Sequence, residues 1–194
     1  MPAADRLSDV LDAAYTCLTR YGVRRTTVDD IATEAGISRS AVYLYVRNKD
    51  DAFRRLAERL HTQALDRARQ AAAAGAPPGD RIRGVLAAKL RLVLDLGGDS
   101  PHTAELLDAR ARLFGDICRD FTADLRTLLA GQFAAAGTPD PARAADICIA
   151  LVVGLEGRPD AAELFEPAVA ALLTGLLPSG AARHHHPPHL RGTS

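Results

Sequence analysis

One short segment constrains the fold of this chain more than any other part of it. Residues 26–49 have the sequence TTVDDIATEAGISRSAVYLYVRNK. Thr27 can cap the first amides of a helix while Asp30 reaches back to the cap, which is the pattern of a capping box. Gly36 suits the left-handed backbone of a tight helix exit, and Ser38 can cap a second helix. The segment therefore predicts two short helices joined by a tight turn.

The second helix of this pair, from about residue 39, has an inner and an outer face. Val42 and Val46 lie one turn apart and should point inward. The other face then carries two tyrosines and a leucine, which are unfavourable in water without a partner. A helix-turn-helix places its second helix in the major groove of DNA, with its N-terminal residues at the base edges. We therefore expect residues 27–46 to form a helix-turn-helix that binds double-stranded DNA.

The candidate DNA contacts divide into residues that read sequence and residues that hold phosphates. Arg39 can form two hydrogen bonds with guanine, Ser40 is a tolerant hydrogen-bonding partner, and Ala41 leaves room for a thymine methyl group. Tyrosine hydroxyls, threonines at a helix start and a lysine at the start of the following helix suit phosphates. The predicted set is Thr26, Thr27, Ser38, Arg39, Ser40, Ala41, Tyr43, Leu44, Tyr45 and Lys49.

The run GVRRTTVDDIATEAGISRSAVYLYVRNKDDAF resembles the DNA-binding domain of TetR-family transcriptional regulators. The likeness is strong over 22–53, extends over a first helix expected at 4–20 and is architectural beyond about residue 70. Val46 departs from the phenylalanine that many members carry, so looser packing is expected beneath the second helix. The resemblance implies a repressor that occupies a palindromic operator until an unknown small-molecule effector lowers its DNA affinity. An activator is left open.

The distribution of charge is compatible with DNA binding. The 194-residue chain has a formal net charge of zero, yet residues 39–69 hold eight Lys or Arg against four Asp or Glu. A local basic face suits phosphates, although ion pairs along a solvated helix explain the same residues equally well. Neither a long apolar run nor a secretory signal pattern is visible. We therefore expect no membrane contact and a cytoplasmic protein, associated with the nucleoid when bound to DNA.

Helical periodicity extends over almost the whole chain, whereas strand-like alternation is absent. We expect an all-α fold of about nine helices. Residues 1–50 would form the helix-turn-helix DNA-binding domain, 51–178 a helical effector-binding and dimerisation domain, and 179–194 a disordered tail. After the helix-turn-helix, the expected helices are 48–74, a fifth after 79 that ends at 97, 101–114, one from 117 to near 137, 141–155 and 161–177. Pro167 is expected to be tolerable only near a first helical turn.

The last two expected helices contain many small and apolar residues, in the runs ICIALVVGLEG and AVAALLTGLL. Such faces can simply bury within their own domain. The resemblance implies instead a homodimer whose interface is built by these two helices from each subunit. It also implies an effector site between the middle helices. The candidate effector contacts are His102, Arg110, Phe114 and Phe121, with Glu105, Asp108 and Arg112 as further polar candidates.

Cysteine redox sensing and catalysis receive less support. Cys17, Cys118 and Cys148 fall in apolar helical stripes, where a free cysteine behaves as a small hydrophobe, so we predict core positions. The sequence has no phosphate-binding glycine loop, Gly-x-Ser-x-Gly elbow or His-Glu-x-x-His pair, so we predict no enzyme. A helical ligand carrier, which would bind no DNA, and an unspecific DNA-binding protein are the alternatives.

A histidine cluster near the end of the sequence is the remaining candidate metal site. It lies among Pro, Gly and Arg residues and lacks the fixed helical spacing of a structural site. We therefore predict no metal and no cofactor. The cluster consists of His184, His185, His186 and His189.

Overall fold

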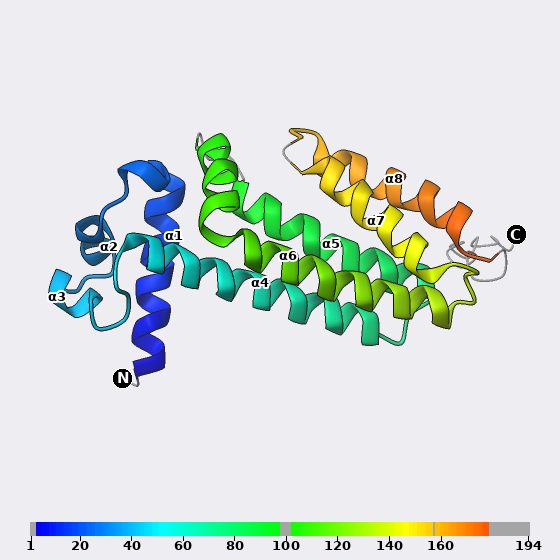
Figure 1. The fold of residues 1–194 in the computed structure, drawn as a ribbon, viewed down its shortest axis with the longest axis horizontal. Helices are drawn as coiled ribbons and strands as arrows, with labels where there is room; N and C mark the ends of the chain where they lie inside the picture. Colours follow the sequence, from blue (N-terminus) through cyan, green and yellow to red (C-terminus); the bar gives the residue numbers. More distant parts are fainter. Residues whose placement is uncertain (1–2, 98–101, 157, 179–194) are drawn as a thin grey trace, which may run out of the picture.

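The computed structural model describes residues 3–97, 102–156 and 158–178, except for the side chains of 3–4, 95–97 and 103–112. These residues form α-helices and turns without a strand, as the predicted all-α class requires (Figure 1). The helices are α1 (Ala3–Arg25), α2 (Val28–Glu34), α3 (Arg39–Val42), α4 (Lys49–Ala73), α5 (Pro78–Gly97), α6 (Thr103–Ala135), α7 (Pro141–Leu155) and α8 (Ala161–Leu176).

Helix α4 joins two hydrophobic cores. Phe53 and Leu56, in its first two turns, are buried with residues of α1, α2 and α3 in a headpiece core. Ala64 and Ala68, further along the same helix, are buried in a body core with residues of α5 to α8. Figure 1 shows the headpiece at one end of the molecule and α4 extending from it along the body. Because α4 is continuous, any displacement of its first half moves the headpiece.

The body places α4, α5 and α6 together and stacks α7 and α8 outside them (Figure 1). Helices α4 and α5 approach closely at Gly84, where an added Cβ would lie 2.7 Å from the Cβ of Ala71. Apolar side chains of α6, including Leu125, Leu129 and Phe133, fill the centre of the body core. The tight α4–α5 contact therefore depends on a glycine facing an alanine.

The expected helices at 101–114 and from 117 form a single element, so the described residues form eight helices rather than nine. Helix α6 has a kink at Phe114, where φ is −148° and ψ is 28°. The sequence pattern located this break, although the two parts form one element on either side of the kink. Gly137, at φ 78°, follows the end of α6, as the sequence predicts.

Several other helix boundaries follow the predictions closely, whereas α1 extends beyond its expected end at residue 20. Helix α1 is interrupted at Gly22, where φ is 78°, and its C-terminal turn follows that glycine. Asp140 caps α7 by accepting a hydrogen bond from the N–H of Arg143 at 3.1 Å. Pro167 corrects one expectation, because it lies inside α8 beyond the first turn. Its ring is exposed, which lets the helix tolerate the missing N–H donor there.

Two further predictions concern the membrane and the end of the chain. Among the described residues, no helix is both long and apolar enough to cross a bilayer. The tail predicted to be disordered, with its four histidines, lies outside the described residues.

Candidate nucleic-acid interface

Helix α2, the following turn and α3 have the capping arrangement that the sequence predicts. The Thr27 hydroxyl accepts a hydrogen bond from the N–H of Asp30 at 3.2 Å, and the Asp30 carboxylate accepts one from the N–H of Thr27 at 2.8 Å. The hydroxyl and N–H of Thr27 hold the pKa of the Asp30 carboxyl below its usual range. Gly36 has a φ of 65°, and Ser38 caps α3 by accepting from the N–H of Ala41. The capping box and the glycine turn are therefore confirmed.

The second helix is short and continues as a tight turn. Regular α-helix covers only residues 39–42, and the N–H groups of Leu44 and Tyr45 donate to carbonyls three residues earlier. Val42 and Val46 are buried in the headpiece core, as their spacing predicts. Most of the other side chains of this segment therefore lie on its outer face.

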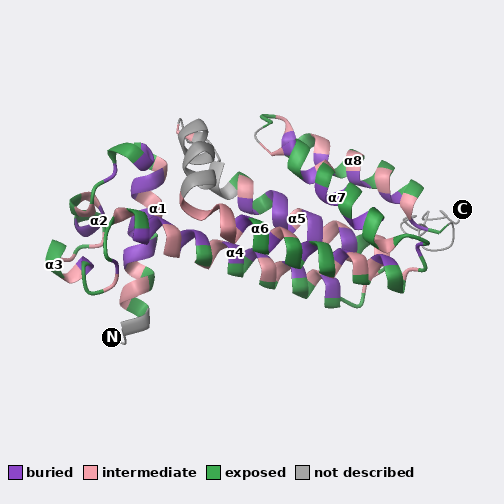
Figure 2. Ribbon diagram, in the orientation of Figure 1, coloured by how far each residue is buried: buried purple, intermediate pink, exposed green. Residues whose placement is uncertain are grey.

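That outer face carries most of the predicted DNA-reading residues at the end of the headpiece (Figure 2). Arg39 and Ser40 are exposed, Tyr43 is 45% exposed and Leu44 is 79% exposed. An apolar side chain as open as Leu44 gains nothing from the headpiece core, so its position suits contact with a partner. Tyr45 differs, because it is half-buried and packs against the headpiece core.

Arg39 is held by neighbours on its own headpiece. Its guanidinium donates to the Asp29 carboxylate at 2.8 Å and to the Tyr43 hydroxyl at 3.2 Å, and it lies 5.7 Å from the centre of the Tyr43 ring. Both members of the ion pair are more than half exposed. Ion pairs between exposed side chains contribute little to stability, so the guanidinium can exchange Asp29 for another partner at low cost.

Thr26 occupies a different position from the one predicted for it. Its side chain is fully buried, and its hydroxyl donates to the carbonyl of Gly22 at 2.7 Å and to that of Cys17 at 3.2 Å. This corrects the prediction of a phosphate contact, because the hydroxyl closes the end of α1 inside the headpiece. Thr27, its neighbour, is exposed.

Lys49 begins α4 as predicted, but its ammonium is turned towards the end of α1. It donates to the carbonyls of Val23, Arg24 and Thr26 at 3.1 to 3.2 Å. These hydrogen bonds satisfy carbonyls that the end of a helix leaves without partners. Lys49 therefore fixes the junction of α1, α2 and α4, and its phosphate contact stays a prediction.

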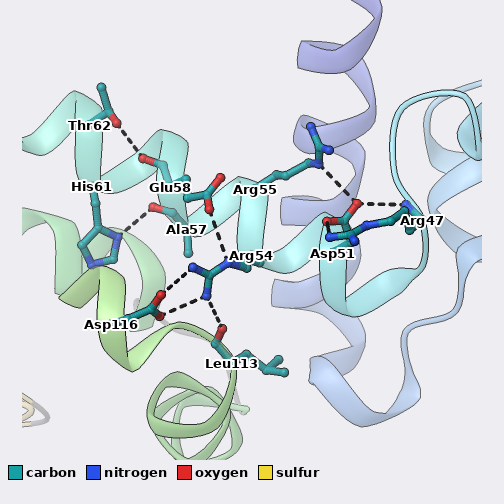
Figure 3. A network of polar contacts seen from close by, with 10 residues as sticks. All are labelled: Arg47, Asp51, Arg54, Arg55, Ala57, Glu58, His61, Thr62, Leu113 and Asp116. Atoms are coloured by element: carbon teal, nitrogen blue, oxygen red, sulfur yellow. Dashed lines mark hydrogen bonds and ion pairs between the residues drawn. The ribbon is translucent and has the colours of Figure 1, made fainter. Parts of the chain in front are cut away.

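Arg47 is a basic residue of this region that the sequence analysis did not single out. Its side chain is 83% exposed, and its N–H and guanidinium donate to the Asp51 carboxylate at 2.9 and 3.1 Å (Figure 3). Arg55 donates to the same carboxylate at 3.2 Å. Burial of Asp51 opposes ionisation, but these donors outweigh it and hold the pKa of the Asp51 carboxyl below its usual range. The spacing Arg-x-x-x-Asp-x-x-x-Arg, formed by Arg47, Asp51 and Arg55, could have predicted this ion-pair cluster from the sequence.

A second polar cluster joins α4 to the kink of α6 (Figure 3). The Arg54 guanidinium donates to the carbonyl of Leu113 at 3.1 Å and to both carboxylate oxygens of Asp116 at 3.0 and 2.5 Å. These hydrogen bonds from Arg54 hold the pKa of the Asp116 carboxyl well below its usual range. Because Leu113 and Asp116 flank the kink at Phe114, a side chain of α4 is attached to both sides of it.

The predicted effector contacts have different positions in the body. Phe121 is buried, Phe114 is half-buried at the kink, and His102 precedes α6 at intermediate exposure. The side chain of Arg110 lies outside the described residues, as do those of Glu105, Asp108 and Arg112. The structure therefore places the two phenylalanines two turns apart on one helix.

Phe121 is the centre of a buried polar cluster that the sequence analysis missed. The ring of His61 meets it edge-on with centroids 5.2 Å apart, and the ammonium of Lys89 lies 5.9 Å from its centroid. Lys89 forms an ion pair with Glu156 at 2.8 Å, and both side chains are at least nine-tenths buried. The four residues come from α4, α5, α6 and the end of α7. Charged groups so deeply buried are unusual in a helical core and are found there only when paired.

The headpiece is a capped helix-turn-helix whose second helix is exposed, and the long helix α4 connects it to a helical body. This arrangement defines the class of helix-turn-helix regulators. Residues 10–60 match the family described as bacterial regulatory proteins, tetR family. The uncharacterized HTH-type transcriptional regulator YfiR of Bacillus subtilis is 42% identical over 53 residues, which are 27% of this chain and only 26% of that protein. The probable HTH-type transcriptional regulator ArpR of Pseudomonas putida is 28% identical over 90% of this chain and 91% of its own length.

Solved structures agree with this classification. A transcriptional regulator of the TetR/AcrR family from Thermobifida fusca is 27% identical, with a TM-score of 0.63 over 88% of this chain and 98% of that one. The complex of SmeT with triclosan has a TM-score of 0.69 at 20% identity, over 97% of this chain and 100% of that one. The headpiece therefore matches the DNA-binding domain of the tetR family of bacterial regulatory proteins, and the chain as a whole is similar to TetR-family regulators.

Proposed function

We propose that this protein is a sequence-specific regulator that binds a palindromic operator as a homodimer, acting as a repressor that a small-molecule effector releases. The observation that carries this proposal is the outer face of α3, where Arg39, Ser40, Tyr43 and Leu44 are exposed above two buried valines. A helix presented in this way can enter a major groove. The contacts of Arg39 with Asp29 and Tyr43 are solvent-exposed, so they can be exchanged for contacts with DNA.

The outer face assigns distinct roles to its residues. Arg39, Ser40 and Ala41 lie at the start of α3 and are proposed to contact base edges. Tyr43 and Thr27 are proposed to contact phosphates on either side of the groove. Lys49 remains a proposed phosphate contact only if its ammonium exchanges a carbonyl for DNA, while Ser38, Leu44 and Tyr45 complete the proposed interface.

The proposed dimer uses the outer surface of α7 and α8. Ile147, Ala150 and Gly154 of α7 are exposed about one turn apart, and α8 exposes Ala170 and Ala171, so the exposed positions include a set of apolar and small residues. Figure 2 shows exposed positions along both helices. Small side chains let helices of two subunits approach closely, and a two-fold dimer matches a palindromic operator. Sedimentation of the protein as a monomer at micromolar concentration would contradict this proposal.

The proposed effector response runs from the body to α4. The cluster around Phe121 offers both charge and aromatic surface for a ligand, and it lies on α6, whose kink is attached to Arg54 of α4. A ligand that changes the kink would therefore move the first half of α4 and with it the headpiece. SmeT, which has been solved with triclosan bound, has the same fold at 20% identity. We infer that this chain also binds a small molecule, and its identity is open.

The test begins with selection of bound DNA from a random duplex pool, followed by titration of the enriched sequence at fixed salt. An Arg39→Ala protein is expected to lose about 1–3 kcal/mol of affinity and to relax preference at one base position. Tyr43→Phe should weaken all sequences alike. Arg69→Ala, on the far half of α4, is the matched control and should change nothing.

Enrichment of a palindrome that Arg39→Ala reads less strictly supports the whole proposal. Binding without any sequence preference would favour the unspecific DNA-binding alternative. Failure to bind any duplex at low salt, with dimers intact, would refute the proposal and favour a ligand carrier.

A further inference from the structure

Cys118 and His61 form a buried pair between α6 and α4. His61 also belongs to the Phe121 cluster, whereas Cys118 has no role in the proposed effector response. The Sγ atom of Cys118 lies 3.4 Å from Nε2 of His61. The other ring nitrogen, Nδ1, lies 2.7 Å from the carbonyl oxygen of Ala57. Because a carbonyl can only accept, Nδ1 must carry the hydrogen of that bond. In the neutral imidazole, Nε2 therefore presents its lone pair to the thiol.

The fixed position of the ring strengthens this pairing. The Ala57 bond sets the tautomer of His61, and the edge-on contact with Phe121 at 5.2 Å holds the plane of the ring. A thiol next to a base that a third group orients is the arrangement that activates nucleophilic cysteines. Cysteine reactivity depends on how readily the thiolate forms.

The other two cysteines lack such an arrangement and supply internal controls. Burial raises the pKa of the Cys17 thiol to about 11, with contributions from Glu34 and Asp30, and burial raises the pKa of Cys148 to about 12. From an ordinary value of 9.0, these shifts lower the thiolate fraction by about 100-fold and about 1,000-fold. Cys17 and Cys148 are 1% and 0% exposed, whereas Cys118 is 9% exposed. Cys118 is therefore the most accessible of the three.

We propose that Cys118 is a covalent modification site for small soft electrophiles of the α,β-unsaturated carbonyl class, with His61 as its general base. The sulfur adds to the β-carbon of the electrophile, so that a C–S bond forms as the C=C π bond breaks. Nε2 of His61 takes the proton of the thiol, and the proton ends on the α-carbon of the adduct. The addition needs no oxidant, metal or further reactant.

The location of Cys118 gives this modification a structural consequence. Cys118 lies one turn after the kink at Phe114 and two residues after Asp116, which binds Arg54 of α4. An adduct on a side chain that is 9% exposed requires α6 to shift against α4. We therefore expect the modified protein to bind DNA more weakly. This consequence rests on the proposed function, whereas the modification itself does not.

The first experiment uses the native full-length protein and N-ethylmaleimide as the probe, with samples quenched over time and digested for mass spectrometry. Cys118 is expected to be labelled well before Cys17 and Cys148, and all three should be labelled alike in concentrated urea. Labelling of Cys118 no faster than the other two in the native protein would overturn the proposal.

A variant separates activation by His61 from simple exposure. His61→Gln is expected to slow labelling of Cys118 by about 100-fold or more, the usual contribution of a general base. The matched control is Thr62→Ala, whose side chain lies on the exposed side of the same helix. Circular dichroism checks that both variants are folded. An unchanged labelling rate in folded His61→Gln protein would overturn the role of His61. If His61→Gln does not fold, the order in which the three cysteines of the native protein are labelled decides the proposal.

The last step compares operator binding before and after labelling. A loss of affinity in the natural protein but not in a Cys118→Ser protein supports the regulatory consequence. Equal affinity of labelled and unlabelled protein would overturn that consequence. Absence of DNA binding before labelling would refute the proposed function instead. The modification site would still be tested by the mass spectrometry of the labelled protein.

Discussion

Replacement of Lys89 by methionine tests whether the body of the protein truly depends on a buried ion pair. Lys89 on α5 is 3% exposed and Glu156 at the end of α7 is 9% exposed, with 2.8 Å between the ammonium and a carboxylate oxygen. Methionine keeps most of the length and apolar contact of the lysine stem, so Lys89→Met removes mainly the charge. The Glu156 carboxylate would then lose the Lys89 ammonium as an ion-pair partner.

The expected loss is large relative to the stability of such a protein. Removing one partner of a buried ion pair costs about 3–5 kcal/mol, because the other charge is left in a medium of low polarity. Because both side chains are at least nine-tenths buried, solvent screening reduces this figure little. Whole domains are stable by only about 5–15 kcal/mol. Lys89→Met should therefore lower the free energy of unfolding by a third or more in a typical case.

Urea unfolding followed by circular dichroism at neutral pH measures this effect for Lys89→Met, Glu156→Gln and the double variant. The double variant should recover most of the stability lost by Lys89→Met, because a neutral amide is less costly to bury than a carboxylate. A coupling energy of about 1–3 kcal/mol is expected from the cycle. A loss below about 1 kcal/mol in Lys89→Met, with no recovery in the double variant, would refute the reasoning, since that is the behaviour of an exposed pair.

Three further predictions concern the headpiece. Asp29→Asn should tighten DNA binding by about 2-fold to 5-fold, because it frees Arg39 from a surface ion pair and removes a negative charge. Unchanged or weaker binding in a filter-binding titration would contradict this prediction. Lys49→Met should lower the melting temperature, because three carbonyls lose their donor, and an unchanged melting curve with weaker DNA binding would assign the ammonium to phosphate instead. The third prediction concerns Asp51, whose pKa is lower in the folded protein than its unfolded value near 3.8. Its contribution to stability is therefore present above pH 3.8 and is lost as the pH falls through the lower folded pKa. The free energy of unfolding of Asp51→Asn should consequently depend less on pH below about pH 4 than that of the natural chain.

The amino-acid sequence by itself determined the local structure of the helix-turn-helix. The Thr27–Asp30 capping box, the glycine turn at Gly36 and the Ser38 cap all depend on residues within a few positions of one another. The inward direction of Val42 and Val46 follows from helical spacing alone. Short-range interactions of this kind are fixed by backbone geometry and donor placement, so they can be read along the chain.

Tertiary structure decided the features in which residues far apart in the chain meet. The burial of Thr26 depends on how the end of α1 packs, and the position of the Lys49 ammonium depends on carbonyls more than twenty residues earlier. Likewise, Arg54 meets the α6 kink, and His61 meets Cys118, only because α4 and α6 lie side by side. No local sequence pattern encodes such contacts, because they form only when the headpiece core and the body core both pack against α4. The exposed outer face of α3 was therefore predictable from sequence, whereas the connection between that face and the body was decided by the packing of α4 against α6.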